Sequence, residues 1–178
     1  DIEDIQDLKD DLDELKKNDL KTYGLEDMEN AFISTSEMTS LIHDIGNPPF
    51  GHFAEETINK WLKINVLPKL ASFESTTKES EDLKNLLAKD ICNYDGNAQA
   101  IRIITKLQRL NLSYFQIIAV LKYTRGGFED KPSEEETLNY LKKKPGYYFS
   151  EKDLVGKIQT TLNIKAGHRF PITYIMEA

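Results

Sequence analysis

The sequence predicts an all-α protein. Apolar residues recur at three- and four-residue intervals through most of the 178-residue chain, which is the spacing of one helix face. Capping residues, glycines and prolines separate these stretches, and almost every strong periodic signal is helical. The sequence is 39% hydrophobic and 30% charged, a balance typical of a globular domain.

The first predicted helix lies within residues 1–17. Its apolar positions alternate with acidic and basic ones: Ile2, Ile5, Leu8, Leu12 and Leu15. The second covers residues 34–44, because Ser34 is a suitable N-cap with Glu37 three residues later. Gly46, followed by two prolines, then ends this helix.

A third helix is expected from about residue 50 to residue 66. Its inward-facing residues would be Phe53, Ile58, Trp61 and Leu62. Further helices are expected at 80–92, 96–110, 113–123, 133–143 and 150–162. A last one covers 170–176, with Pro171 at its start. The polar stretches 68–80 and 126–132 are predicted loops that are too short to separate domains, so residues 1–178 form part of one domain.

Charge and cysteine content restrict the classes of function. The 23 basic and 30 acidic residues give a net charge of −7, which argues against an extended nucleic-acid surface. A small anionic substrate stays compatible with this charge where a few basic groups converge. The single Cys92 fits a reducing, cytoplasmic location. No apolar run approaches the roughly 18 residues that a membrane span needs.

Two of the three histidines lie within one short stretch, residues 43–55. Imidazole and carboxylate groups both bind divalent metals, so His43 and Asp44 are candidate ligands. His52 and Glu55 are spaced i, i+3 on a predicted helix and therefore share a face. A carboxylate beside an imidazole fixes its tautomer and raises its basicity, as a general acid or base requires. The pattern predicts a metal site beside an acid–base site.

Each pair taken alone has an ordinary interpretation. A His-Asp dipeptide is more often a surface or capping pair, and a His–Glu pair at this spacing is more often an exposed helix pair. The combination of both pairs across a Gly/Pro bend favours the functional interpretation.

The stretch HDIGNPPFGHFAEETINKW (43–61) resembles the signature of the HD-superfamily deoxynucleoside triphosphate triphosphohydrolases, in particular the dGTPases of enterobacterial type. Other segments follow in the family's order: TYGLEDMENAF (22–32), NYDGNAQAIRI (93–103), NLSYFQIIAVLKYTRGGF (111–128), KKPGYYFSEKDL (143–154) and RFPITYIMEA (169–178). The resemblance implies an HD-domain helical bundle, of which this chain is a part. It also implies a homo-oligomer, commonly a hexamer, with single-stranded DNA as an effector in some members.

In that family a divalent metal is held by a His, a His-Asp pair and a distant Asp. His43 and Asp44 match the pair, whereas the first His and the last Asp are expected outside residues 1–178. Mg²⁺ or Mn²⁺ is the expected metal, and the ligand types also suit Fe²⁺, Co²⁺ or Zn²⁺. His52 and Glu55 match the catalytic pair. The implied reaction is attack of water on the α-phosphorus of dGTP, or of another deoxynucleoside triphosphate, with release of the deoxynucleoside and triphosphate.

The resemblance also implies substrate contacts at Asn97, Lys122, Tyr123 and Lys144, the last three with the triphosphate; Arg125 is a further candidate. Without the resemblance, both lysines would be interpreted as helix C-terminal residues and Tyr123 as a packing residue. Two alternatives stay open. One is another HD-type nucleotide phosphohydrolase, and the other is an inactive piece that serves as a binding or assembly module.

Overall fold

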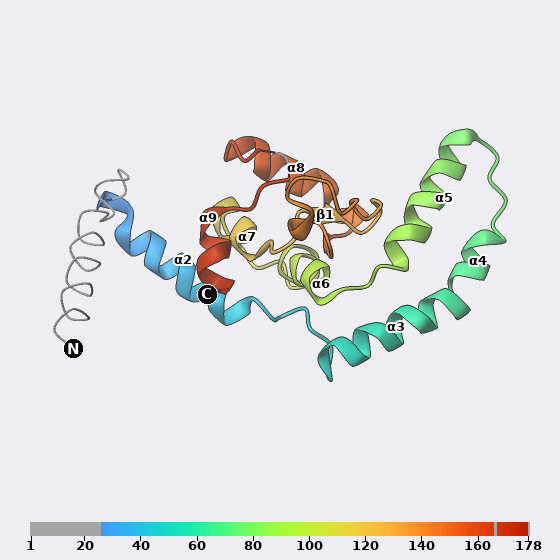
Figure 1. Cartoon of the computed structure of the whole chain (residues 1–178), viewed down its shortest axis with the longest axis horizontal. Helices are drawn as coiled ribbons and strands as arrows, with labels where there is room; N and C mark the ends of the chain where they lie inside the picture. The colour runs from blue at the N-terminus through green and yellow to red at the C-terminus, as the bar shows by residue number, and fades with distance from the viewer. Residues whose placement is uncertain (1–25, 166, 178) are drawn as a thin grey trace.

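The computed structural model describes residues 26–165 and 167–177 and is mostly helical (Figure 1), which confirms the all-α class. Its α-helices are α2 (Glu29–Ile42), α3 (Gly51–Asn65), α4 (Leu67–Ala71), α5 (Lys78–Ile91), α6 (Gly96–Arg102), α7 (Tyr114–Val120), α8 (Lys152–Thr161) and α9 (Pro171–Glu177). The other elements are the 3₁₀ turns η1 (Glu26–Met28), η3 (Asn139–Leu141) and η4 (Phe149–Glu151), the π-helical η2 (Ile103–Leu107), and the strands β1 (Arg125–Gly126) and β2 (Pro145–Tyr147). Within these described ranges, no helix combines the length and the apolar character needed to cross a membrane.

The core lies where α6, α7 and α8 meet around the two strands (Figure 1). Its buried side chains are Ala100, Ile101, Ile104, Ile117, Ile118, Val120, Leu121, Phe128, Tyr147, Val155 and Ile158. Phe128 packs edge-on against Tyr147 and Phe149, with ring centroids 6.1 and 5.3 Å apart. Each large apolar side chain buried in this way stabilises the fold by roughly 1.5–3 kcal/mol. The hydrophobic core therefore supports the start of α6 and the loop before β2.

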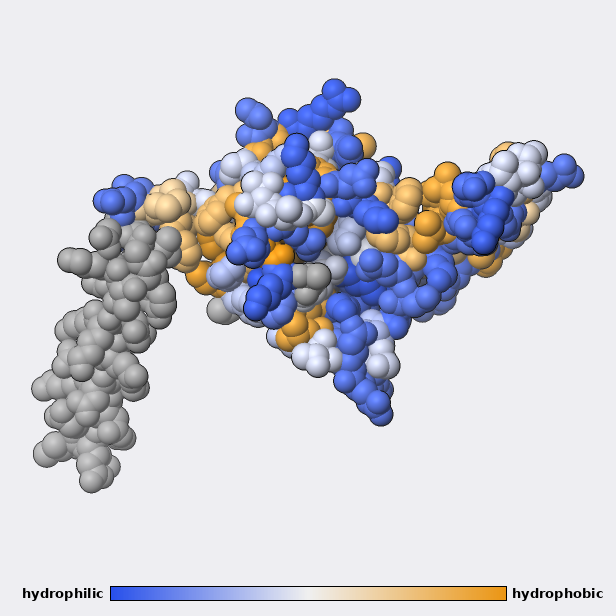
Figure 2. All heavy atoms as spheres, turned by 90° about the horizontal axis from the view of Figure 1, so that it is seen from above, coloured by the Kyte–Doolittle hydropathy of each residue, from blue (hydrophilic) through white to orange (hydrophobic). Residues whose placement is uncertain are grey.

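Helices α3, α4 and α5 form an open arm that extends from this core (Figure 1). The main helix contact of α3 is with the short α4, so most of its apolar face is uncovered. The prediction that Phe53 and Trp61 face inward is wrong, because both are exposed, whereas Ile58 and Leu62 are half-buried. Hydrophobic residues are visible at the surface along this arm and along α2 (Figure 2).

Most predicted helices are present close to their expected ranges: 50–66, 80–92, 96–110, 113–123, 150–162 and 170–176. Helix α7 is shorter than expected, because Leu121 turns to an extended conformation. Helix α2 is longer, since it starts at Glu29, and Ser34 lies inside the helix instead of capping it. This longer helix packs on both α7 and α9, and these contacts stabilise the extra turn. The amphipathic segment 1–17 lies outside the described residues.

The helix predicted at 133–143 is wrong. This segment consists of turns and η3, because Leu138 has a left-handed backbone (φ of 62°) that a continuous α-helix does not accommodate. The backbone N–H of Thr124 donates to the Leu141 carbonyl (2.9 Å), and Nε of Arg125 donates to the Lys142 carbonyl (2.8 Å). The predicted loop 68–80 is also partly helical, because α4 occupies its start.

The two strands, which the periodicity does not predict, form a parallel pair with Arg125 opposite Pro145. Gly146 permits this pairing, since a Cβ atom at that position would overlap the Tyr123 carbonyl. The pairing places the chain before β1 beside the chain before β2. The candidate residues Tyr123 and Lys144, at opposite ends of a 22-residue stretch, thereby both lie just before the paired strands.

Candidate active site

The bend between α2 and α3 packs directly against the first turn of α6. A Cβ atom at Gly46 would overlap the Gly96 carbonyl oxygen and the backbone nitrogen of Ala100, so only glycine fits this contact. Phe50, which precedes α3, has a left-handed backbone with φ of 70°. The segment of residues 43–55 and the segment around Gly96, which are far apart in sequence, therefore meet through their backbones.

His43 and Asp44 lie at the end of α2, and both are exposed. Nδ1 of His43 is 2.7 Å from the Ser40 carbonyl, so this nitrogen carries the proton and donates it. Nε2 then presents its lone pair 3.2 Å from the Oδ2 atom of Asp44. Two electron-pair donors that face each other are stabilised by a cation between them, which is a proton or a metal ion. Because metal–ligand bonds of roughly 2.0–2.2 Å connect donors about this far apart, the pair fits two ligands of a divalent ion.

Two adjacent donors would make up only part of a metal site. The part of the chain that the structure describes holds no cluster of three or more His, Cys, Asp or Glu side chains suited to a metal. The remaining ligands would have to come from elsewhere.

His52 and Glu55 come together on the first turns of α3. Glu55 is buried, and its Oε1 accepts a 2.7 Å hydrogen bond from the backbone N–H of Gly96. The other carboxylate oxygen, Oε2, is 3.7 Å from Nδ1 of His52. The imidazole itself is 82% exposed, and its Nε2 is 3.2 Å from Nζ of Lys144. A buried and anchored carboxylate thus stands behind a solvent-facing imidazole.

Lys144 joins this pair to the start of α6. Its Nζ lies 3.6 Å from Oδ2 of the buried Asp95, in addition to its contact with His52. Asp95 caps α6, since its Oδ1 accepts from the backbone N–H of Asn97 (2.9 Å) and from the side-chain amide of Asn97 (2.6 Å). The loop before β2 carries Lys144, so the interpretation as a helix C-terminal lysine does not apply.

Asp95 is a site residue that sequence reasoning missed. The available signal was an Asp directly before a Gly-Asn pair at a predicted helix start, which indicates only a cap. Its contact with Lys144 depends on tertiary structure, which sequence spacing does not reveal.

Lys122 and Tyr123 lie in a second cluster, beside α9. Nζ of Lys122 is 3.1 Å from Oε1 of Glu177. Arg169 donates to the Lys122 carbonyl and to Glu177, and its guanidinium carbon lies 5.5 Å from the centre of the buried Tyr123 ring. The structure connects this cluster to Lys144 through the strand pairing, without a side-chain contact between Lys122 and His52.

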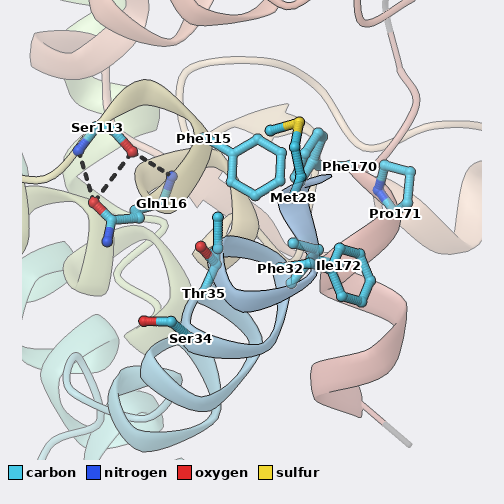
Figure 3. Close-up of a pocket in the computed structure, with 11 residues that line it drawn as sticks. Met28, Phe32, Ser34, Thr35, Ser113, Phe115, Gln116, Phe170, Pro171 and Ile172 are labelled. Atoms are coloured by element: carbon cyan, nitrogen blue, oxygen red, sulfur yellow. Dashed lines mark hydrogen bonds between the residues drawn. The ribbon is translucent and has the colours of Figure 1, made fainter. Parts of the chain in front are cut away.

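The largest cavity is elsewhere in the molecule. It measures about 630 Å³ and lies between α2, α7 and α9 (Figure 3). Its lining is mainly apolar, with the rings of Phe115 and Phe170 in edge-on contact at 4.7 Å and Met28 beside them (Figure 3). None of the candidate site residues lines it. A smaller cavity of about 160 Å³ adjoins Asp95 and Lys144.

No protein-family model matches the chain. The functional interpretation is therefore supported by the site geometry and by the sequence resemblance.

Proposed function

We propose that this chain is part of a metal-dependent HD-type phosphohydrolase that hydrolyses dGTP, or another deoxynucleoside triphosphate, to the deoxynucleoside and triphosphate. One observation carries the proposal. The exposed imidazole of His52 lies between the anchored carboxylate of Glu55 and the ammonium of Lys144, on a helix that begins just after the His43–Asp44 pair. The ordered segments of the resemblance supply the substrate class.

The contacts of His52 indicate which tautomer the neutral imidazole adopts. An ammonium group only donates hydrogen bonds, so Nε2 accepts from Lys144 and the proton lies on Nδ1, facing Glu55. Glu55 stabilises the imidazolium that forms when Nε2 takes up a proton. When Lys144 turns to a phosphate oxygen, Nε2 becomes free to exchange a proton with the substrate.

The proposed reaction is a substitution at the α-phosphorus. The oxygen of water bonds to this phosphorus, and the bond from phosphorus to O5′ breaks. His52 takes up the proton that water releases and supplies the proton that the departing O5′ requires, so that it acts as general acid or proton shuttle. The products are deoxyguanosine and intact triphosphate.

His43 and Asp44 would hold the divalent metal, with further ligands from outside residues 1–178. When bound, the ion polarises a phosphoryl oxygen and neutralises charge that develops in the transition state. Mg²⁺ and Mn²⁺ are the first candidates, and imidazole with carboxylate also suits Fe²⁺, Co²⁺ and Zn²⁺.

Asn97 would contact the substrate, and Lys144, Lys122 and Tyr123 would contact its triphosphate. Lys122 is paired with Glu177 in the structure. A partly exposed ion pair of this kind contributes about 1 kcal/mol or less, so a highly charged phosphate chain can displace the carboxylate. Assembly as a homo-oligomer, commonly a hexamer, and a response to single-stranded DNA belong to the same proposal and depend on the resemblance alone.

The direct test is product analysis. The longest natural form of the chain and residues 1–178 are each incubated with dGTP and Mg²⁺ or Mn²⁺, and the products are separated by chromatography. Deoxyguanosine and triphosphate are expected from the longest form, whereas residues 1–178, which would supply only two metal ligands, are expected to have little or no activity. Formation of dGMP with pyrophosphate, or of dGDP with phosphate, would contradict the proposal. A panel of cyclic, mono- and triphosphate nucleotides distinguishes it from other HD-type phosphohydrolases.

The second candidate is a binding or assembly module without activity. One observation favours this candidate: the described residues supply only two adjacent candidate metal ligands, His43 and Asp44. Titration of residues 1–178 with Mn²⁺ addresses it: weak binding that Asp44→Asn abolishes indicates a partial metal site, whereas identical behaviour of wild type and variant favours the module.

A further inference from the structure

Helix α3 has one face on the core and one face in solvent, and the solvent face carries large apolar side chains. On the core side, Glu55 is buried, and Asn59 exchanges two hydrogen bonds of 2.8 Å with the backbone just before α6. On the outer side, Phe53, Trp61 and Ile64 are 74%, 57% and 72% exposed among the described residues. Apolar side chains gathered in this way on one helix face mark an interaction surface.

The outer face has the spacing of a coiled-coil seam. Four residues form its centre, at intervals of four, three and four: Phe53, Thr57, Lys60 and Ile64. These intervals match alternating d and a positions of a heptad written abcdefg. In this register Glu56 and Lys63 take the g positions on one flank of the seam, and Ala54 and Trp61 take the e positions on the other.

The seam is complementary to itself when two α3 helices lie antiparallel. A two-fold axis midway between residues 58 and 59 places Phe53 of each copy against Ile64 of the other. Helices paired in this direction bring g positions to g positions, so Glu56 of each copy meets Lys63 of the other. Every contact occurs twice, because a two-fold interface uses the same surface on both copies.

The e flank and the opposite direction of pairing both favour the antiparallel arrangement. On the e flank, the small Ala54 of one copy faces the large ring of Trp61 of the other, so a side chain of small volume accommodates one of large volume. A parallel pair would instead place the two Lys60 side chains against each other at the same d position. It would also separate Glu56 from Lys63 of the second copy.

We propose that the outer face of α3 is a self-association surface, on which a second copy of this chain docks with its α3 antiparallel. His52 and Glu55 lie at c and f positions, off the seam, so the pairing leaves the candidate acid–base pair accessible. The family resemblance implies assembly but indicates no surface. The assignment to α3 rests on the residues of this helix and does not depend on the hydrolase function. A seam within a 15-residue helix is short, so the association is weak and depends on concentration.

The first test is sedimentation velocity of residues 1–178 over a wide range of protein concentration, without nucleotide or metal. A reversible monomer–dimer equilibrium is expected. Phe53→Ser should weaken it by roughly tenfold or more, because the two-fold interface loses this apolar side chain twice. Phe73→Ser is the matched control, since Phe73 is an exposed phenylalanine outside α3, and it should associate like wild type. Circular dichroism checks that both variants are folded.

The second test uses the charges of the g flank. Glu56→Lys and Lys63→Glu should each weaken association by roughly tenfold, because each variant faces like charges at two places in its own dimer. An equimolar mixture of the two variants should associate like wild type, since the mixed dimer regains both opposite-charge pairs. Glu37→Lys, at an exposed position on α2, is the control and should leave association unchanged.

Three outcomes would overturn the proposal. Residues 1–178 could stay monomeric at the highest attainable concentration, which would show that another part of the protein or a different partner covers this face. The Phe53 and Phe73 variants could associate equally well, or mixing the two charge variants could fail to restore association. A chain that dimerises through α3 but fails to hydrolyse dGTP refutes the proposed function alone, and a monomeric chain that hydrolyses dGTP refutes this inference alone.

Discussion

Nε2 of His52 lies 3.2 Å from Nζ of Lys144, a residue 92 positions later in the chain. The contact connects the helix after the Gly/Pro bend to the loop before β2, and it places a positive charge at the nitrogen that would exchange protons. A ligand that draws Lys144 away would also expose the lone pair of His52. In the proposed hydrolase, substrate binding and activation of the imidazole would therefore be coupled through one ammonium group.

His52→Ala should lower dGTP turnover by roughly 10²- to 10⁴-fold, the usual contribution of a general acid or base. The side chain is 82% exposed, so the thermal midpoint should hardly change. His168→Ala is the control, because His168 is also exposed and lies outside the cluster. Equal turnover by the two variants would show that His52 has no catalytic role.

Glu55→Gln should lower turnover while keeping most of the stability. The amide oxygen can still accept from the Gly96 N–H, whereas the charge that supports the imidazolium is lost. Glu55→Ala should in addition destabilise the fold by about 1–3 kcal/mol, because a buried N–H loses its partner. Urea denaturation measures this difference. The neighbouring exposed Glu56→Gln should leave both quantities unchanged, and a similar loss there would contradict the assignment.

Gly46→Ala should destabilise the protein by several kcal/mol, on the order of the overpacking penalties of tight cores. The new methyl group would overlap backbone atoms of Gly96 and Ala100, which cannot move independently of α6. Gly156→Ala, in the middle of α8, has open space around its Cβ and should stabilise by roughly 0.5–1 kcal/mol. Thermal unfolding of both variants is the measurement, and shifts of the same sign would show that the backbone contact is absent.

The contribution of Asp90 to the stability of the fold should fall as pH rises from about 4 to 6. Burial raises the pKa of this carboxyl from 3.8 to about 6, with the nearby Glu151 charge adding to the effect. The folded state thus binds a proton more tightly than the unfolded state, so the cost of ionising the buried group is absent at low pH and complete above pH 6.

Asp90→Asn should therefore be more stable than wild type at pH 7, by at most about 3 kcal/mol, with little or no gain at pH 4. The backbone N–H of Phe149, which donates to Asp90 at 3.0 Å, can bond to the Asn oxygen as well. Urea titrations at both pH values test this. Asp82→Asn, exposed on the same helix, should show no such pH-dependent gain.

The sequence predicts helices well where local signals agree. Pro171 begins α9 as predicted, because its effect on a helix start is local. The capping box of Thr77 and Ser80 at the start of α5 is also local, but it lies in the predicted loop 68–80. The predicted helix at 133–143 fails because Leu138 takes a left-handed conformation, and the end of the segment bonds to Thr124 and Arg125. These bonds join residues that are far apart in sequence.

The residues of the candidate site also fall into two groups: those that local spacing brings together and those that only the tertiary structure brings together. The i, i+3 spacing places His52 and Glu55 on one face without further information. The contacts of Lys144 with Asp95 and of Gly46 with Gly96 arise from segments 49 and 50 residues apart, which no periodicity connects. The parallel strand pair at Arg125 is likewise too short to leave a pattern.

The donor that fixes Glu55 is a peptide N–H in the first turn of α6, a helix of only seven residues. The orientation of the carboxylate therefore follows the path of the main chain and not the identity of a neighbouring side chain. That turn is buried in the core and capped by Asp95. We therefore expect heat inactivation to coincide with the global unfolding transition instead of preceding it.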